Sequence, residues 1–259
     1  MDNSPELSVI ILNYKTDQMV IDLIGGLIPD PRMEILVVDN SPENTLESKL
    51  SRRSDLSCFY TGSNSGYSGG NNYGIEKARG EWILILNSDT KTNTSDLLKL
   101  LEITKKNPVL VSTPRLIQPD GVIQDNVGFL DPIYINPTNA IFARPRFIKA
   151  EEIKENIFVD CLTGAAMLVH KTVFEKIGLL DDKKFFMYFE DMDFSQRLKR
   201  AGIKVLYIPS VSIIHYGGAS SDQDSRQKNI NYQNGLKTYL KKHRGRFITF
   251  INEKLHLLS

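Results

Sequence analysis

Cysteine is scarce in this sequence. Cys58 and Cys161 are the only two, they lie far apart, and neither belongs to a C-x-x-C pair. This argues against a disulfide scaffold or a zinc site and fits a reducing compartment. Long apolar runs are also missing, because none approaches the roughly 20 residues that cross a bilayer, and residues 1–6 lack the apolar segment of a signal peptide. We therefore expect a cytoplasmic protein, or one that lies on a membrane without crossing it.

Charge of one sign is not in excess either. The net charge of +1 gives no reason to expect nucleic acid as a partner. The hydrophobic share of 41% and the charged share of 24% are those of an ordinary globular protein. The 259 residues suffice for one large domain, or for one domain with an appendage.

Short apolar runs alternate with helical patterns through the first part of the chain. This order predicts an α/β fold, in which helices flank a mostly parallel, Rossmann-like central sheet joined by right-handed crossovers. The predicted strands are residues 7–12, 34–40, 56–60 and 82–86, and the predicted helices are 17–27, 43–53 and the segment from the loop at 64–72 to residue 80.

The second part of the chain is less regular. We expect a helix at 96–106 capped by Ser95, a short strand at 109–113, and loops with short antiparallel strands over 114–160. Strands are then predicted at 158–169, 204–208 and 211–215, and helices at 172–177 and 190–201.

The tail of the chain is basic. Seven Lys or Arg residues and no acidic residue lie between Arg226 and Arg246. Two helices are predicted in this tail, with a break near Gly245.

Polar residues follow the predicted strand at 82–86, which has the unbroken apolar run of a strand buried on both faces. These residues are Asn87, Ser88 and Asp89. Ligands of parallel sheets bind at the carboxyl ends of the strands, so Asp89 is suited to hold a divalent cation, which in turn holds phosphate. The alternative is that Asp89 caps the following helix.

Two other strands also end in polar residues. Asn13 and Tyr14 follow the first strand, and Asp39 ends the second. The Asp39 carboxylate suits a nucleobase N–H or a ribose hydroxyl, although D-N-S-P is also a good turn sequence. The glycine- and asparagine-rich loop at 64–72, which contains Asn64 and Gly70, can bring backbone N–H groups close to a ligand at a helix N-terminus.

Glu190 and Asp191 follow an aromatic run at 185–189. Aromatic neighbours tend to raise a carboxylate pKa, which favours a general base, whereas the alternative is simply an acidic helix N-terminus. His215 lies at a strand end, where a single histidine is usually structural. It is a candidate metal ligand only if it shares a cleft with Asp89, where its imidazole completes a metal site. A G-x-G-x-x-G turn is missing after the first strand, which disfavours a nicotinamide-dependent oxidoreductase.

Taken in order, four blocks of this sequence resemble the family 2 glycosyltransferases of the GT-A fold. The blocks are residues 8–14, 37–40, 64–89 and 163–215, and the likeness covers residues 7–220. The third and fourth blocks are most similar to bacterial rhamnosyltransferase-like members that build surface polysaccharides.

The resemblance implies a role for each matching residue. Asp191 matches the catalytic base, and Asp89 with His215 matches the site of a Mg²⁺ or Mn²⁺ ion. Asn87 replaces the first acid of the family's D-x-D motif, so we expect modest metal affinity. The residues implied to bind the nucleotide sugar are Asn13, Tyr14, Asp39, Asn64, Gly70, Asn87, Ser88 and Glu190.

The resemblance also implies the reaction and the partners. The expected enzyme transfers a sugar with inversion from dTDP-rhamnose, or from a UDP-sugar, to a hydroxyl of a glycan or lipid-linked acceptor. A non-catalytic sugar-nucleotide-binding module is the alternative of another class. Residues 1–113 are expected to bind the nucleotide and residues 114–220 the acceptor.

Residues 221–259 are expected to form a basic helical extension of this domain. A cationic amphipathic segment can rest on anionic lipid at the inner face of the plasma membrane. A solvated helical face or a homodimer contact is an equal alternative.

Overall fold

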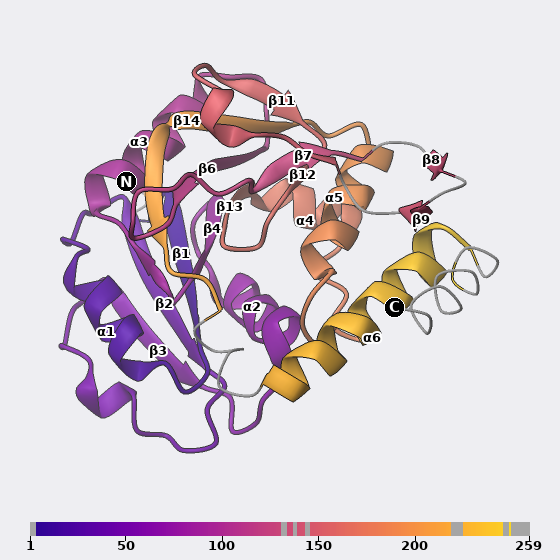
Figure 1. Cartoon of the computed structure of the whole chain (residues 1–259). Helices are drawn as coiled ribbons and strands as arrows, with labels where there is room; N and C mark the ends of the chain where they lie inside the picture. The colour runs from indigo at the N-terminus through magenta and orange to yellow at the C-terminus, as the bar shows by residue number, and fades with distance from the viewer. Residues whose placement is uncertain are drawn as a thin grey trace.

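The computed structural model describes residues 4–130, 134–136, 139–142, 146–218, 225–245 and 249. Its centre is a nine-stranded sheet (Figure 1) with the strand order β11-β14-β6-β13-β4-β1-β2-β3, in which β5 also pairs with β14. The strands are β1 (Leu7–Asn13), β2 (Met33–Asp39), β3 (Leu56–Tyr60), β4 (Trp82–Asn87), β5 (Thr90–Lys91), β6 (Val111–Ile117), β11 (Ile157–Val159), β13 (Ala166–His170) and β14 (Val205–His215).

Most strands of this sheet run in one direction. β1 pairs in parallel with β2 and β4, β2 pairs in parallel with β3, and β6 pairs in parallel with β14. β13 is antiparallel to both of its neighbours, β4 and β6. The carboxyl ends of β1, β2, β4, β6 and β14 therefore point the same way, and the predicted mostly parallel sheet is confirmed.

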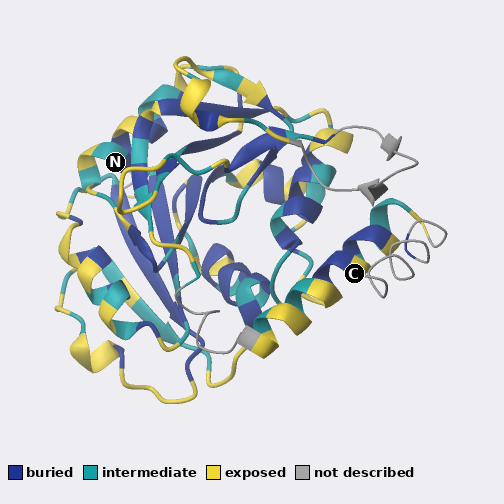
Figure 2. Cartoon of the chain, viewed as in Figure 1, coloured by how far each residue is buried: buried dark blue, intermediate teal, exposed yellow. Residues whose placement is uncertain are grey.

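Helices cover both faces of the sheet. α1 (Asp17–Gly25) and α3 (Thr94–Lys105) pack on one face, and α2 (Gly66–Lys77), α4 (Lys171–Ile177) and α5 (Glu190–Arg200) pack on the other. Side chains of β4 alternate between these two apolar layers, as the twofold period of a strand requires. The unbroken apolar run of β4 is thus explained by burial on both faces, and Figure 2 shows the central strands buried.

Short strands over residues 114–160 were predicted and are present. β7 (Val127–Phe129), β10 (Arg146–Phe147) and β12 (Cys161–Leu162) form a small antiparallel sheet, and β8 (Tyr134–Asn136) pairs with β9 (Asn139–Phe142). The prediction of one strand over 158–169 is wrong. That stretch is divided among β11, β12 and β13, because β12 pairs with the small sheet while its neighbours pair with the large one.

The prediction of a helix over 43–53 is also wrong. Only a 3₁₀ turn, Glu47–Lys49, forms there. Leu46 is the only buried residue of the stretch, so the segment has no apolar stripe that a helix could bury.

Two smaller predictions need correction. α3 begins at Thr94 and is capped by Asn93, whose side chain accepts the Asp96 N–H at 2.9 Å, so Ser95 is not the cap. The two strands predicted at 204–208 and 211–215 are one strand, β14. It passes through Pro209 by an irregularity in its pairing with β6, which is where a sheet tolerates a residue that lacks an N–H.

The C-terminal helix α6 (Ser225–His243) packs along the body of the protein, next to α5 (Figure 1). Leu236, Tyr239 and Leu240 are buried in an apolar cluster that also contains Phe185, Phe189 and Met192. None of the helices in the described ranges has the length and apolar character needed to cross a membrane. The second helix predicted for the tail lies almost wholly outside the described residues.

Charged groups hold the end of α6 against α5. The Asp193 side chain is fully buried, and it contacts His243 Nε2 at 2.7 Å, Lys242 Nζ at 2.6 Å and Arg197 Nε at 2.9 Å. Burial by itself would raise the pKa of Asp193, but the hydrogen bonds from His243 and Lys242 and the charge of Arg197 lower it to about 2. Asp193 is therefore ionised at neutral pH and ties the two helices together.

Gly235 sets the close approach of α6 to the loop before α5. A Cβ at this position would lie 2.5 Å from the carbonyl oxygen of Tyr188. Within a helix alanine is intrinsically favoured over glycine by about 1 kcal/mol, but overpacking costs about 1–3 kcal/mol. We expect Gly235→Ala to lower the free energy of unfolding, measured by urea denaturation, despite its better helix propensity.

Gly25→Ala in α1 is the matched control. No atom lies within 4 Å of a Cβ added there, so this variant keeps its propensity gain and is expected to be neutral or stabilised. If both variants were equally stabilised, α6 would not approach Tyr188 as described.

Candidate active site

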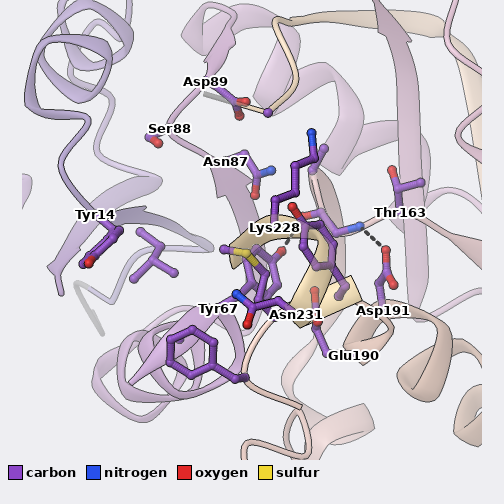
Figure 3. Close-up of a pocket in the computed structure, with 18 of the residues that line it drawn as sticks. Tyr14, Tyr67, Asn87, Ser88, Asp89, Thr163, Glu190, Asp191, Lys228 and Asn231 are labelled. Carbon is purple, nitrogen blue, oxygen red and sulfur yellow. Dashed lines mark hydrogen bonds between the residues drawn. The ribbon is translucent and has the colours of Figure 1, made fainter. Parts of the chain in front are cut away.

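A cavity of about 770 Å³ opens at the carboxyl ends of β1 and β4 (Figure 3). Its walls come from the turn after β1, the end of β4, the loop that leads into α5, and the first turns of α6. Most of the predicted site residues line it, although they come from distant parts of the chain. These are Tyr14, Asn64, Asn87, Ser88, Asp89, Glu190, Asp191 and His215.

Asp89 and His215 meet because β5 pairs with β14. Thr90 lies opposite His215 in this antiparallel pair, and the Tyr216 N–H donates to the Asp89 carbonyl oxygen at 2.9 Å. His215 Nε2 is 3.5 Å from Asp89 Oδ1. The condition that sequence reasoning placed on His215, a shared cleft with Asp89, is fulfilled.

Gln124 orients the imidazole of His215. Its Nε2 donates to the His215 carbonyl oxygen at 2.9 Å, and its Oε1 lies 2.8 Å from His215 Nδ1. Because this amide oxygen can only accept, a neutral His215 carries its proton on Nδ1 and presents the Nε2 lone pair toward Asp89. Gln124 was not among the predicted site residues, since it lies in a stretch without a periodic pattern or a motif.

The donor set at this edge suits a divalent cation. A carboxylate oxygen and an imidazole nitrogen held by a hydrogen-bonded partner are ordinary metal ligands. No group of three or more His, Cys, Asp or Glu side chains comes together among the residues that the structure describes. Asp89 and His215 therefore provide only part of a coordination shell, which phosphate and water oxygens are able to complete.

The loop before α5 has an unusual backbone. Tyr188 and Phe189 have φ angles of 70° and 68°, a left-handed conformation that is strained for bulky side chains. The bend places the first turn of α5, with Glu190 and Asp191, at the wall of the cavity. Strain at this point is tolerated because Phe189 is packed in the apolar cluster beneath α6.

Backbone N–H groups hold both oxygens of Asp191. Oδ2 accepts the Gly164 N–H at 3.0 Å, a bond drawn in Figure 3, and Oδ1 accepts the Met192 N–H at 2.7 Å. Burial raises the pKa of Asp191, and these N–H groups act against that rise. The carboxylate is thus fixed in orientation at the cavity wall, which is what a general base requires.

Glu190 is more deeply buried than Asp191. Its Oε2 has no hydrogen-bond partner among the described residues. Desolvation, together with the negative charge of Asp191, raises the pKa of Glu190 well above its ordinary value. Of the two acids, Glu190 is therefore the one that takes up a proton more readily.

Tyr67 connects the loop at 64–72 with the Asp191 side of the cavity. Its N–H donates to the Phe186 carbonyl oxygen at 2.7 Å, and its hydroxyl donates to the Gly164 carbonyl oxygen at 2.5 Å. Gly66 precedes it with a φ of 74°, and a Cβ there would collide with the Phe186 backbone. This glycine is therefore required by a close approach of two loops.

Three residues predicted to contact the nucleotide sugar are not among those lining this cavity. Asn13 and Asp39 are buried side by side at the ends of β1 and β2, where Asn13 Nδ2 donates to Asp39 Oδ1 at 2.9 Å. Gly70 lies inside α2, and a Cβ there would meet the Leu12 side chain. Gly70 therefore allows α2 to pack closely on β1.

Residues of α6 complete the cavity, and sequence analysis did not foresee them. Gln227, Lys228 and Asn231 line the cavity, and Figure 3 shows Lys228 and Asn231 among the labelled side chains. Lys228 and Asn231 share a helix face with Gly235, at spacings of three and four residues, so the contact with Tyr188 directs them inward. The sequence shows that residues 228, 231 and 235 share a helix face, but it does not show which part of the protein that face contacts.

Comparison with solved structures defines the class of protein. The chain superposes on the crystal structure of GalNAc-T7 with UDP, GalNAc and Mn²⁺ with a TM-score of 0.63 and 16% identity, covering 93% of this chain and 48% of the other. It superposes on the mannosyltransferase PcManGT of Pyrobaculum calidifontis, in complex with GDP-Man and Mn²⁺, with a TM-score of 0.61 and 14% identity, covering 99% and 71%. The fold is that of the GT-A glycosyltransferases.

Sequence comparison adds the family. The model of glycosyl transferase family 2 matches residues 8–178, and the chain belongs to this family. It is 32% identical over 221 residues to the low-salt glycan biosynthesis hexosyltransferase Agl10 of Haloferax volcanii, covering 81% of this chain and 67% of that protein. It is 25% identical over 225 residues to the N-acetylglucosaminyl-diphospho-decaprenol L-rhamnosyltransferase of Mycobacterium tuberculosis, covering 77% and 71%. The resemblance to rhamnosyltransferase-like members is confirmed.

Glu190→Gln tests the burial of this carboxyl group. A carboxyl whose folded-state pKa is raised contributes stability below its unfolded pKa, near 4.3, and loses it as the pH rises through the folded pKa. We therefore expect the melting temperature of Glu190→Gln, relative to the parent protein, to increase between pH 5 and pH 8.

Glu155→Gln changes an exposed glutamate in the same way and serves as the control. A difference between Glu190→Gln and the parent that stays constant from pH 5 to pH 8 would mean that Glu190 is ionised over the whole range.

Proposed function

We propose that this protein is an inverting, metal-dependent glycosyltransferase. It transfers L-rhamnose from dTDP-rhamnose to a hydroxyl group of a glycan or lipid-linked acceptor during surface polysaccharide synthesis. The observation that carries the proposal is that Asp89 with His215, and Asp191 with Glu190, line the same cavity. A cation-binding edge and a carboxylate base on one cavity are the two parts that such a transfer requires.

The donor lies across the strand ends in this proposal. Tyr14 and Asn64 line the side that would take the nucleoside, and Asn87 and Ser88 lie at the end of β4 beside Asp89. Asn13 and Asp39 are buried at the ends of β1 and β2, and Asp39 Oδ2 has no hydrogen-bond partner among the described residues. An acceptor oxygen left in this state suits a base N–H or a ribose hydroxyl.

Asp89 and His215 would hold Mg²⁺ or Mn²⁺ in this site. When bound, the ion neutralises charge on the leaving diphosphate. The uncharged Asn87 adds no second carboxylate, which keeps protein affinity for the ion modest and makes binding depend on the nucleotide.

Asp191 acts as the base in this mechanism. Its orientation is fixed by the N–H groups of Gly164 and Met192, and its raised pKa favours accepting a proton. It takes the proton of the acceptor hydroxyl, whose oxygen attacks C1 of the donor sugar as the bond from C1 to the diphosphate breaks. One displacement on the face opposite the leaving group inverts the anomeric centre.

The choice of donor and acceptor rests on relatives. One of those compared above is a rhamnosyltransferase whose name specifies a polyprenyl-diphosphate sugar as acceptor, and a second is a hexosyltransferase of glycan biosynthesis. The rhamnosyltransferase name favours L-rhamnose as the transferred sugar and a lipid-linked acceptor for this chain, and dTDP-rhamnose is the donor that we propose for it. A UDP-hexose is the second candidate donor, because a hexosyltransferase is the relative with the higher identity of the two.

Donor hydrolysis tests the proposal without a known acceptor, since water can take the place of the hydroxyl. With Mn²⁺, we expect slow release of nucleoside diphosphate from one of dTDP-rhamnose, UDP-glucose, UDP-GalNAc and GDP-mannose, and loss of that release with EDTA. Asp191→Asn is expected to lower the rate about 10²- to 10⁴-fold while the thermal shift caused by the nucleotide is unchanged.

Asp182→Asn is the matched control, because Asp182 is exposed and does not line the cavity. Nucleotide binding by the parent protein without any hydrolysis or transfer would favour a non-catalytic binding module. An Asp191→Asn rate close to that of the parent would remove the base assignment.

The domain division and the subcellular location belong to the same proposal. Residues 1–113 bind the nucleotide, 114–220 shape the acceptor side, and 221–259 form the basic extension of a cytoplasmic enzyme.

The exposed basic residues of α6 are the proposed membrane contact. Arg226, Lys237 and Lys241 are exposed on α6, and they would contact anionic lipid at the inner face of the plasma membrane. Such a contact brings the cavity close to a lipid-linked acceptor. A homodimer contact through the same face is the alternative.

Flotation with vesicles separates these alternatives. We expect the protein to float with vesicles containing phosphatidylglycerol but not with pure phosphatidylcholine, and to be released by 0.5 M NaCl as screening predicts. Replacing Arg226, Lys237 and Lys241 with glutamine should abolish flotation. Unchanged flotation of this variant, or a mass in solution that falls from dimer to monomer with it, would rule out lipid as the partner of this face.

A further inference from the structure

The cavity is short of positive charge. Among its described lining residues the acids are Asp89, Asp125, Glu190 and Asp191, whereas Lys15 and Lys228 are the only Lys or Arg. A nucleoside diphosphate carries two or more negative charges, and it would enter a site in which acidic side chains outnumber lysines. Asn87 makes the strand-end metal site weaker than one with two carboxylates. A second cation near the diphosphate would therefore contribute strongly to binding.

Lys15 is not placed for this role. It follows Tyr14 in the turn after β1, and its Nζ lies 5.4 Å from the centre of the Tyr14 ring. This puts Lys15 on the nucleoside side of the cavity, on the same wall as Tyr14.

Lys228 enters the cavity from α6. Figure 3 shows its side chain extending from the helix toward the end of the cavity that holds Asn87 and Asp89. Its position on the helix is set by packing, because residues 228, 231 and 235 fall on one face and Gly235 is in close contact with Tyr188. Two further turns along, Lys242 and His243 bind the buried Asp193 and fix the rotation of the helix.

From this geometry we infer that Lys228 binds the diphosphate of the donor, as the second positive charge of a site whose strand end has lost one acid. The inference rests on the proposed function. It makes α6 part of the donor site as well as the proposed membrane-facing element. The remaining basic residues of the helix then have separate roles, with Lys242 in an internal ion pair and Lys241 exposed.

Calorimetric titration of the 259-residue protein with UDP, dTDP and GDP in the presence of Mn²⁺ tests the inference. For the nucleotide that the parent binds, Lys228→Met is expected to weaken affinity about 10- to 100-fold. It should also flatten the dependence of affinity on salt, because one fewer charge contacts phosphate. Lys228→Arg keeps the charge and should retain most of the affinity.

Lys241→Met is the matched control, since it removes a charge from the exposed side of the same helix and should leave affinity unchanged. Equal affinities of Lys228→Met and the parent, equal losses in Lys228→Met and Lys241→Met, or an equal loss in Lys228→Arg with an unchanged melting temperature would each overturn the inference. If the parent binds none of the three nucleotides, the proposed function itself fails. The two failures are therefore distinguishable.

Discussion

The antiparallel pairing of β5 with the end of β14 is the interaction on which the site depends. It carries His215 to within 3.5 Å of Asp89, although the two residues are separated by most of the second half of the chain. The backbone pairing, together with the Tyr216 N–H that donates to the Asp89 carbonyl oxygen, fixes the backbone positions of both residues. Gln124 then selects the imidazole nitrogen that faces Asp89.

Helix α6 has a comparable role on the other side of the cavity. Its apolar residues close the cluster around Phe189, where the backbone is strained, and Asp193 binds its last turn. The conformation that places Glu190 and Asp191 at the cavity wall is thus stabilised by burial that a distant segment supplies. A tail that is basic in composition therefore has an internal face that packs and lines the cavity, and an external face that is charged.

The fold was predictable from sequence wherever one residue pattern had one structural meaning. The apolar run of β4 requires burial on both faces, and the structure confirms it together with the mostly parallel sheet. Predictions failed where local pattern and tertiary context disagreed. The stretch 158–169 is apolar enough for one strand, but two sheets compete for it. The stretch 43–53 has good helix formers but only Leu46 is buried, so nothing holds a helix there.

The sequence alone determined which chemical groups stand at the strand ends, since the residues after β1, β2 and β4 follow directly from the apolar pattern. It also determined membership of the family, whose model matches residues 8–178. Only the tertiary structure decided that Asn13 and Asp39 are hydrogen-bonded to each other and do not line the cavity, and that Gln124 and Lys228 do line it. The reason is physical. Sequence patterns indicate the local backbone conformation and its burial. The contacts of a side chain also depend on segments that are distant in sequence, and sequence separation does not indicate which of these segments lie close in space.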